Sequence, residues 1–338
     1  MQDYLRRCLD SLIVPEEQMQ LLEVLVVNDG SKDNSSAIAH EYQDKYPGTF
    51  RVIDKENGNY GSCVNRGLKE TTGKYIKILD ADDWFDTDNF ELFIKKLYEI
   101  DVDVVITNYT SYFPGETKDT AFSFNKGLFS FEEAFCDKRY ELESVQMHAI
   151  CYKTSCFHGL NYHQTEGISY TDQEWILLPW INVSKLFYLP LSVYQYNLSR
   201  EGQTCDMKVY FDKMPDQFLG IKNSIAAFSR LSLSDDNLHK KIVFSKIKSR
   251  IENLYRCILL YKRENPDFLI NFDKELSNNN VMFSVLNTVK LHPYFPYCYI
   301  SSWRNNGYKK MPFVVFATNL FLENAVSFFK YIAKKINN

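Results

Sequence analysis

The sequence predicts an α/β fold, in which a mixed β-sheet is flanked by helices, followed by an α-helical C-terminal extension. Two observations predict the first part: residues 21–27 and 75–79 are apolar segments typical of buried strands, and each runs into a polar turn. A third observation predicts the extension, because hydrophobic residues recur with helical spacing from Asp206 onward. We therefore expect one domain over residues 1–205 and a helical region over 206–338. The helices expected in that region are 211–231, 239–263 and 313–336.

The first strand ends in Asn28-Asp29-Gly30-Ser31, and Asp33 follows where it can cap a helix that runs to about Tyr46. In open α/β sheets, ligands bind just beyond the carboxyl ends of the strands. Asp29 is therefore a candidate binding residue. Between the two strands, residues 56–68 form a Gly- and Asn-rich loop that leads into a helix, which predicts backbone N–H groups directed at a phosphate or a base.

The second strand ends in three carboxylates within four residues, Asp80, Asp82 and Asp83. Carboxylates crowded at a strand end repel one another, so we expect a divalent cation or a set of donors to neutralise them. An Asp-x-Asp pair after an apolar strand can hold a hard cation against a substrate diphosphate. The alternative is a solvated acidic turn that caps a helix.

Taken in order, these segments resemble a known family, the family 2 nucleotide-sugar glycosyltransferases. The shared pattern covers roughly Tyr4 to Thr204. The resemblance implies a GT-A fold, which is a single α/β domain whose mixed sheet binds a nucleotide diphosphosugar. The motifs that carry it are Asn28-Asp29-Gly30-Ser31, Glu56-Asn57-Gly58 with Asn65-x-Gly67, Gly73-Lys74-Tyr75-Ile76 and Leu79-Asp80-Ala81-Asp82-Asp83.

The resemblance also implies roles for individual residues. Asp29 is expected to contact the uracil or the ribose of the donor. Asp80 is expected near the ribose and the sugar, and Asp82, with Asp80, is expected to ligate Mn²⁺ or Mg²⁺. Asn65 matches a donor-binding Asn of the family, although the Arg that often precedes it is Val64 here.

The segment from Glu166 to Trp175 carries acidic side chains into an apolar stretch that is predicted to be helical as far as Trp180. Inverting sugar transfer requires a carboxylate that takes the proton of the acceptor hydroxyl during a single displacement. Asp172 is the candidate base, because it aligns by resemblance with the family's acidic residue at the start of this helix. Glu174 is the second candidate, and helix N-capping is the structural alternative for Asp172.

The segment from Tyr194 to Thr204 resembles the family's closing segment, a tyrosine-rich strand followed by a flexible loop. Arg200 and Thr204 are expected to reach the donor diphosphate as that loop closes. The alternative is that Arg200 is a surface cation without a role.

Members of this family open with a strand of the type Ile-Ser-Val-Ile-Val-Pro-x-Tyr-Asn, whereas this chain begins inside the helix that follows such a strand. We expect either a misplaced start or a compromised protein, because loss of a central strand leaves backbone groups unpaired. The alternative function is therefore a truncated, inactive glycosyltransferase-like protein that binds or scaffolds. A nucleotidyltransferase is disfavoured, because the sequence has no Gly-rich start signature.

The composition favours a cytoplasmic enzyme. The eight Cys residues are scattered, without Cys-x-x-Cys or zinc-ligand spacing, which indicates reduced thiols. No signal peptide is evident, and no segment reaches about 18 uninterrupted apolar residues. Nucleic acid is not expected as a partner, because the sequence shows no recognised binding motif.

The charge is unevenly distributed along the chain. Residues 1–205 contain 19 Lys and Arg against 32 Asp and Glu, a net of −13, whereas residues 206–338 contain 20 against 11, a net of +9. The last expected helix, 313–336, combines bulky apolar residues with lysines at its end. This pattern predicts either a helix packed on its own protein or an interfacial helix on an anionic membrane surface.

Together these observations predict a metal-dependent, inverting hexosyltransferase. The expected donor is a UDP-linked sugar, and the expected acceptor is a hydroxyl of a glycan or a lipid-linked molecule. The family implies capsule, exopolysaccharide or cell-surface glycan synthesis, in the cytoplasm or peripherally on the inner face of the cell membrane.

Overall fold

The computed structural model describes residues 1–200, 203, 207–293 and 295–336, with the backbone alone for residues 207 and 325–336. The chain divides into two compact units, Met1–Phe244 and Ser245–Asn338, which are described separately. Asp206, where the sequence predicted the domain change, lies outside the described residues. The predicted limits of the catalytic domain therefore stay a prediction.

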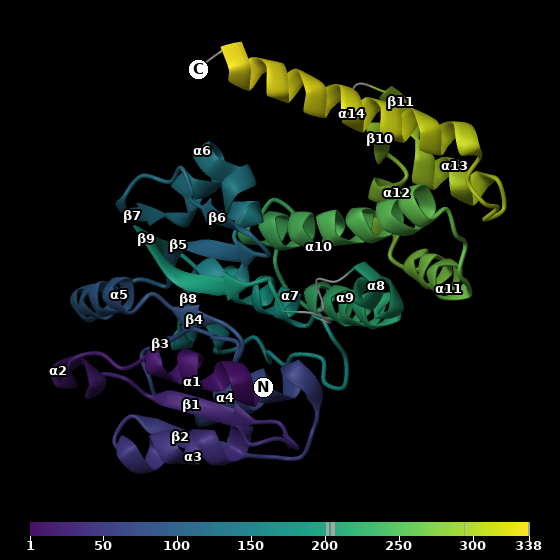
Figure 1. Cartoon of the computed structure of the whole chain (residues 1–338). Coiled ribbons are helices and arrows are strands. Elements are labelled where there is room, and N and C mark those ends of the chain that lie inside the picture. Colours follow the sequence, from purple (N-terminus) through teal and green to yellow (C-terminus); the bar gives the residue numbers. More distant parts are fainter. Residues whose placement is uncertain (201–202, 204–206, 294, 337–338) are drawn as a thin grey trace. The chain divides into compact units, whose positions relative to one another are not determined.

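The first unit contains a parallel pair of strands and a mixed sheet (Figure 1). The pair is β1 (Val24–Asn28) and β2 (Phe50–Asp54), connected by α3 (Ser35–Lys45). The mixed sheet is built from β3 (Tyr75–Ile76), β4 (Trp84–Phe85), β5 (Val104–Phe113), β6 (Glu116–Thr120), β7 (Gly127–Ser130), β8 (Ile150–Lys153) and β9 (Lys185–Asn197). Its order is β3-β8-β5-β9-β4, with β6 beside β5 and β7 beside β9. Because β5 and β9 run parallel while the other pairs are antiparallel, the predicted α/β class with a mixed sheet is confirmed.

Helices cover the strands of the first unit, and two of them show clear N-terminal caps. The Asp86 carboxylate accepts from the Asn89 N–H at 2.9 Å, and Ser130 and Glu133 form a reciprocal capping box. The helices are α1 (Gln2–Asp10), α2 (Glu16–Met19), α4 (Asn59–Glu70), α5 (Thr87–Glu99), α6 (Phe131–Ser144), α7 (Asp172–Trp175), α8 (Met207–Asp212) and α9 (Met214–Ser229).

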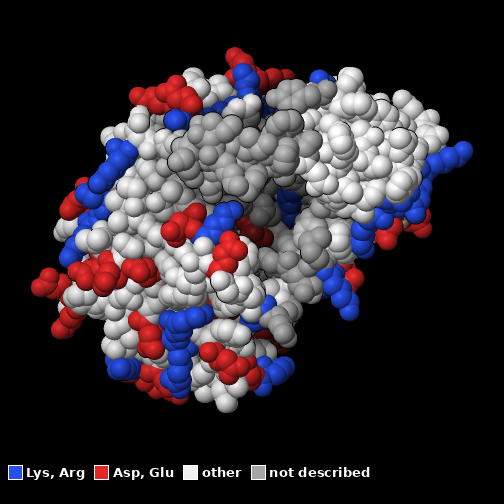
Figure 2. All heavy atoms as spheres, turned by 45° about the horizontal axis from the view of Figure 1, so that its top comes forward, with Lys and Arg blue, Asp and Glu red and all other residues white. Residues whose placement is uncertain are grey.

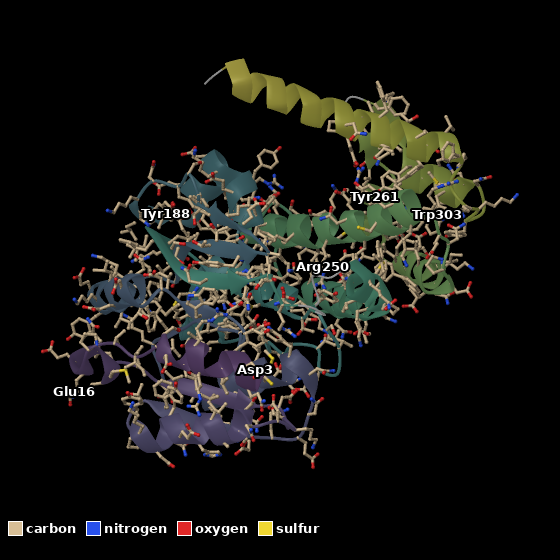
Figure 3. The ribbon with its side chains drawn as sticks, in the orientation of Figure 1. Asp3, Glu16, Tyr188, Arg250, Tyr261 and Trp303 are labelled. Carbon is tan, nitrogen blue, oxygen red and sulfur yellow. The ribbon has the colours of Figure 1, made fainter. Side chains whose placement is uncertain are left out.

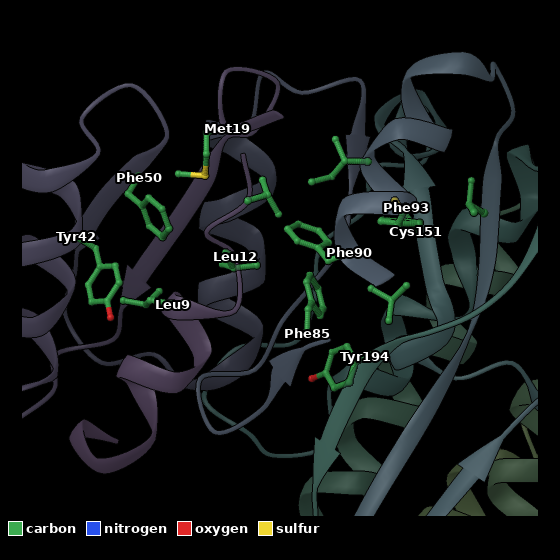
Figure 4. Close-up of a cluster of buried hydrophobic side chains, with 14 of the residues drawn as sticks. Leu9, Leu12, Met19, Tyr42, Phe50, Phe85, Phe90, Phe93, Cys151 and Tyr194 are labelled. Carbon is green, nitrogen blue, oxygen red and sulfur yellow. The ribbon is translucent and has the colours of Figure 1, made fainter. Parts of the chain in front are cut away.

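A hydrophobic core lies where α1, α3 and α5 pack against strands β1, β2 and β9 (Figure 4). Leu9, Phe50, Phe90, Phe93 and Tyr194 are buried in this cluster. Removal of these large apolar side chains from water supplies most of the driving force for folding. The same cluster fixes the end of β9 against the turn that precedes β4, which is where the acidic residues lie.

Two elements differ from the expectation. The strand expected over 75–79 is only Tyr75–Ile76, because among the described strands β3 pairs with β8 alone, at two residues. The stretch expected to be helical to Trp180 breaks: α7 ends at Trp175, and a 3-10 turn, Leu178–Asn182, follows. Pro179 has no N–H with which to continue an α-helical ladder. Strand β1 resembles β3 in having one partner, because among the described strands it pairs with β2 alone.

The second unit is helical with one short hairpin. Of the three helices expected after residue 206, the first appears as α9 in the first unit. The second appears as α10 (Leu238–Arg256), which runs from the first unit into the second and continues as a π-helical turn (Cys257–Lys262), and the third appears as α14 (Phe313–Ile336). The other elements are α11 (Asp267–Leu276), α12 (Asn280–Leu286), α13 (Tyr299–Asn305) and the unexpected hairpin β10 (Lys290–His292) and β11 (Phe295–Cys298).

A buried aromatic core and one buried ion pair hold this unit together. Trp303 (Figure 3) is fully buried edge-on to Tyr255, with ring centroids 5.9 Å apart. Arg304 Nη2 lies 2.6 Å from Asp273 Oδ1. Among the described residues, no helix combines the length and the hydropathy that crossing a lipid bilayer requires.

Candidate active site

Asp29 lies directly after β1, and the loop that follows β2 holds its carboxylate. Lys55 Nζ lies 2.5 Å from Oδ1, and the Gly58 N–H donates to the same oxygen at 2.9 Å. Burial raises the pKa of Asp29, but these two donors outweigh it and hold the pKa below its usual range. The carboxylate is therefore ionised and fixed at the carboxyl end of β1, where the sequence predicted a binding residue.

An open pocket of about 630 Å³ lies beside these groups, at the carboxyl ends of β1 and β2. A positive φ of 70° at Gly30 turns the chain at its wall, where an added Cβ would lie 3.2 Å from the Asn57 nitrogen. The pocket is lined by Gly30, Lys32, Asp54, Lys55, Glu56 and Asn57.

Asp80, Asp82 and Asp83 lie in the turn between β3 and β4. The pKa of Asp80 is raised well above its usual range, first by burial and then by the charges of Asp83 and Asp82. The charge of Asp172 raises it further. The structure therefore brings Asp172 within electrostatic range of the acidic turn, although the two are far apart in the sequence.

Asp83 points into the protein and is 1% exposed. Its carboxylate accepts from the Tyr194 hydroxyl at 2.5 Å and from the Asn197 N–H at 2.7 Å. The Tyr194 oxygen in turn accepts from the Asp80 N–H at 3.2 Å. Burial raises the pKa of Asp83 to about 7, with both hydrogen bonds acting in the opposite direction. Asp83 thus fastens the acidic turn to the end of β9.

Arg200 follows β9 and contacts the acidic turn. Its Nε donates to Asp82 Oδ2 at 3.0 Å, and Gln203 Nε2 donates to the same oxygen at 3.2 Å. The residue predicted to reach the diphosphate therefore lies against a residue predicted to bind the metal. Thr204 lies outside the described residues, so its predicted contact with the donor stays a prediction.

Asn65 lies on α4 and holds the segment that leads to Asp172. Its Nδ2 donates to Glu166 Oε1 at 2.8 Å and to the Gln164 carbonyl at 2.9 Å, while its Oδ1 accepts from the Gln164 N–H at 2.8 Å. At Gly61 of the same helix, an added Cβ would lie 2.1 Å from the Thr165 carbonyl oxygen. The helix and the segment therefore pack backbone against backbone, and the predicted donor contact of Asn65 stays a prediction.

Asp172 is the first residue of α7, whose N-cap is Thr171. Capping therefore does not account for Asp172. Its carboxylate accepts from Gln173 Nε2 at 3.0 Å, and its charge acts on the Tyr60 hydroxyl as well as on Asp80. Glu174, the other candidate base, is 7% exposed, and its Oε2 accepts from the Thr165 N–H at 2.7 Å. This contact ties Glu174 to the same segment that Asn65 holds.

The sequence interpretation missed several residues of the site. Lys55, Tyr194 and Asn197 contact the predicted residues, but their partners are 26 to 114 positions away, so no local pattern reveals them. Lys77 could have been identified as unusual from the sequence, because it is a charged residue within an apolar segment. Its Nζ donates to the His148 carbonyl at 2.7 Å and to the Ile150 carbonyl at 3.2 Å, and burial lowers its pKa to about 8.

Comparison with known proteins supports the family resemblance that the motifs predicted. The family model described as glycosyl transferase family 2 matches residues 2–161. Over these residues, which are just under half of the chain, the sequence is similar to glycosyl transferase family 2, as the motifs predicted.

Bacterial relatives include proteins named as glycosyltransferases and one named as a teichoic acid biosynthesis protein. The chain is 28% identical to glycosyltransferase GlyA of Streptococcus pneumoniae over 212 residues, which is 59% of this chain and 29% of GlyA. It is 38% identical to EpsH of Bacillus subtilis over 119 residues, 35% of this chain and 33% of EpsH. It is 38% identical to the minor teichoic acid biosynthesis protein GgaB of Bacillus subtilis over 88 residues, 26% of this chain and 10% of GgaB. The chain thus spans about a third or less of these relatives.

Among solved structures, residues 1–349 of S. aureus TarS in complex with UDP-GlcNAc match with a TM-score of 0.62 and 18% identity. The match covers 82% of this chain and 77% of that one. At this identity the likeness shows the fold, and it confirms the predicted GT-A type.

Proposed function

We propose that the chain transfers a hexose from a UDP-linked sugar to a hydroxyl of a glycan or a lipid-linked acceptor. The observation that carries this proposal is that Asp172 lies within electrostatic range of Asp80 in the acidic turn, where its charge helps to raise the pKa of Asp80. One group belongs to the predicted donor side and the other to the predicted acceptor side. The complex of TarS with UDP-GlcNAc supports the donor class.

Donor binding is assigned to the groups at the strand ends. Asp29, held ionised by Lys55, would contact the uracil or the ribose beside the pocket at the ends of β1 and β2. Asp80 would lie near the ribose and the sugar. The remaining donor-binding residues of the proposal are Asn65, Arg200 and Thr204.

Asp82 and Asp80 would hold a divalent cation, Mn²⁺ or Mg²⁺. Carboxylate oxygens are the ligands that these hard cations prefer. In the described structure burial, and then the neighbouring carboxyl groups, raise the pKa of Asp80, while Arg200 and Gln203 donate hydrogen bonds to Asp82. An added positive charge would therefore be favourable in this turn. Among the described residues no ready cluster of three or more metal-binding side chains is present. When bound, the cation would neutralise charge on the departing diphosphate.

Asp172 would act as the general base. It would take the proton of the acceptor hydroxyl as that oxygen attacks the anomeric carbon. The bond from the anomeric carbon to the diphosphate oxygen breaks on the opposite face, so the configuration inverts and UDP leaves. Arg200 would exchange its contact with Asp82 for the diphosphate and stabilise the charge that develops there.

The setting would be capsule, exopolysaccharide or other cell-surface glycan synthesis, on the cytoplasmic side of the cell membrane, and similarity to the teichoic acid biosynthesis protein GgaB supports it. The alternative is an inactive glycosyltransferase-like protein that binds a sugar nucleotide or scaffolds other proteins. The two differ in turnover, since only the enzyme releases UDP from a sugar nucleotide.

A screen of nucleotide sugars tests the proposal. The full chain is incubated with UDP-, GDP- and TDP-sugars, with Mn²⁺ or with a chelator, and release of the nucleoside diphosphate is measured. In a separate reaction the chain is incubated with nucleoside triphosphates and a sugar phosphate, and release of pyrophosphate is measured. We expect metal-dependent release from a UDP-sugar, unchanged in Asp44→Asn, an exposed control on α3. Binding without release from any donor would support the inactive alternative, and release of pyrophosphate from a nucleoside triphosphate would contradict both.

A further inference from the structure

The described part of helix α14 carries Asn319 on its buried face and Glu323 in contact with it, whereas Asn324 is exposed. Val315 and Asn319 lie on the buried face, 8% and 2% exposed. Asn319 Oδ1 accepts from Arg256 Nη1 at 2.9 Å, and Asn319 Nδ2 donates to Glu323 Oε1 at 3.2 Å. The Tyr261 hydroxyl (Figure 3) donates to Glu323 Oε1 at 2.6 Å. This network fixes which face of α14 turns toward its own unit.

The opposite face of α14 carries large apolar side chains at the surface. Phe313, Val314, Leu320 and Phe321 are 62%, 66%, 44% and 70% exposed. At 3.6 residues per turn these four side chains lie within about a third of the helix circumference, with Ala317 and the exposed, uncharged Asn324 between them. We call them the outer face. Clustered exposed apolar side chains mark an interaction site more often than scattered ones do.

Positive charge lies next to the outer face. Lys309 and Lys310 are exposed and precede the helix by a few residues. The Arg263 guanidinium lies 5.1 Å from the centre of the Phe313 ring. Figure 2 shows a broad uncharged area at the upper right, with Lys and Arg side chains and a few Asp and Glu side chains along its lower edge. Residues 245–338 contain 14 Lys and Arg against 6 Asp and Glu, a net of +8.

We propose that the outer face of α14 docks on an anionic lipid surface. Aromatic and aliphatic side chains beside lysines match the boundary between acyl chains and anionic headgroups, whereas a protein partner would require no such basic margin. Each lysine near an anionic leaflet strengthens binding roughly fivefold, and salt weakens this contribution. The docking proposal is supported by α14 and the basic residues beside it. Its purpose, access to a lipid-linked acceptor, rests on the proposed function.

Cosedimentation of the full chain with vesicles tests the docking. The vesicles contain phosphatidylcholine alone or phosphatidylcholine with phosphatidylglycerol, at low and at high salt. We expect the chain to bind the anionic vesicles, and we expect high salt to weaken this binding. The double variant Lys309→Glu/Lys310→Glu should lower the partition coefficient by at least about tenfold, and Val314→Ser/Phe321→Ser should abolish most binding.

Matched controls separate docking from general charge and hydrophobicity. Val281→Ser on α12 changes a side chain that is 67% exposed, nearly the same as Val314. Lys118→Glu on β6 makes the same replacement at one exposed lysine, with half the charge change of the double variant. Both controls should bind vesicles as the parent chain does.

Three results would overturn the docking: no binding, equal binding to neutral and anionic vesicles, or binding that the α14 variants leave unchanged. Self-association that Val314→Ser/Phe321→Ser abolishes would also overturn it, because a second copy would then cover the outer face. Release of UDP in solution is measured in parallel. If the parent chain does not release UDP, the proposed function is contradicted, but the conclusion from the vesicle experiment is unaffected.

Discussion

Arg200 donates through Nε to Oδ2 of Asp82 at 3.0 Å, so a cation predicted to bind the donor diphosphate lies on a carboxylate predicted to bind a metal. Gln203 contacts the same oxygen at 3.2 Å. A divalent cation at Asp82 would replace this compensation and bring the diphosphate to the position where Arg200 already lies. The predicted roles of these two residues are therefore compatible within one site.

Asp82→Asn should weaken metal-dependent donor binding by at least about tenfold, because the change removes a charged oxygen ligand and keeps the shape. The variant should remain folded, since its neighbour Asp83 keeps its buried contacts. UDP affinity measured by calorimetry with and without Mn²⁺ checks this, with Asp44→Asn as the control. If the parent chain and Asp82→Asn bind UDP equally well in the presence of Mn²⁺, the assignment of Asp82 as a metal ligand is contradicted.

Tyr194→Phe should lower the free energy of unfolding by about 1–3 kcal/mol, because it leaves the buried Asp83 carboxyl group without one of its donors. Chemical denaturation measures the change. Tyr98→Phe on α5, at a side chain that is 78% exposed, should change the free energy of unfolding by less than about 0.5 kcal/mol. Equal effects at the two positions would mean that the Tyr194 hydroxyl does not fasten the acidic turn.

Gly61→Ala should destabilise the first unit by about 1–3 kcal/mol, because its Cβ would meet the Thr165 carbonyl and must push α4 away. Gly67→Ala, on the same helix, has nothing within 4 Å of the added Cβ. It should be neutral or stabilise by up to about 1 kcal/mol through helix propensity. The stabilities of the two variants are compared by thermal unfolding. If Gly61→Ala does not lower the stability, the close packing of α4 against Thr165 is contradicted.

His148 should make the protein less stable in acid. Burial lowers its pKa to about 3, and Nδ1 has no hydrogen-bond partner in the described part of the chain. The unfolded state therefore binds a proton between about pH 6.5 and 3 that the folded state does not. Stability should fall as the pH is lowered through this window, by up to about 1.4 kcal/mol per pH unit.

His148→Phe keeps a ring against Tyr196, 4.1 Å away by centroids, and cannot titrate. Its unfolding free energy should therefore depend less on pH below about 6.5. His158→Phe, at an exposed position, should keep the dependence of the parent chain. An unchanged slope in His148→Phe would show that other groups cause the acid lability.

The α/β class, the polar strand ends and the helical extension were predictable from sequence because each rests on local periodicity. The strand after Gly73 was predicted too long, since the length of β3 depends on how many residues its neighbour β8 can pair. The contacts of Asp83 with Tyr194 and of Asn65 with Glu166 join segments about a hundred positions apart. No spacing within one segment reveals such pairs, so these positioning contacts emerged only from the structure.

The most direct measurement of the central claim is sugar transfer by Asp172→Asn beside donor binding by the same variant. A general base acts only when the hydroxyl attacks, so transfer should fall by about 10²–10⁴-fold while UDP-sugar affinity stays within about twofold. Retained transfer in Asp172→Asn, together with its loss in a folded Glu174→Gln, would contradict the assignment of Asp172 as the base.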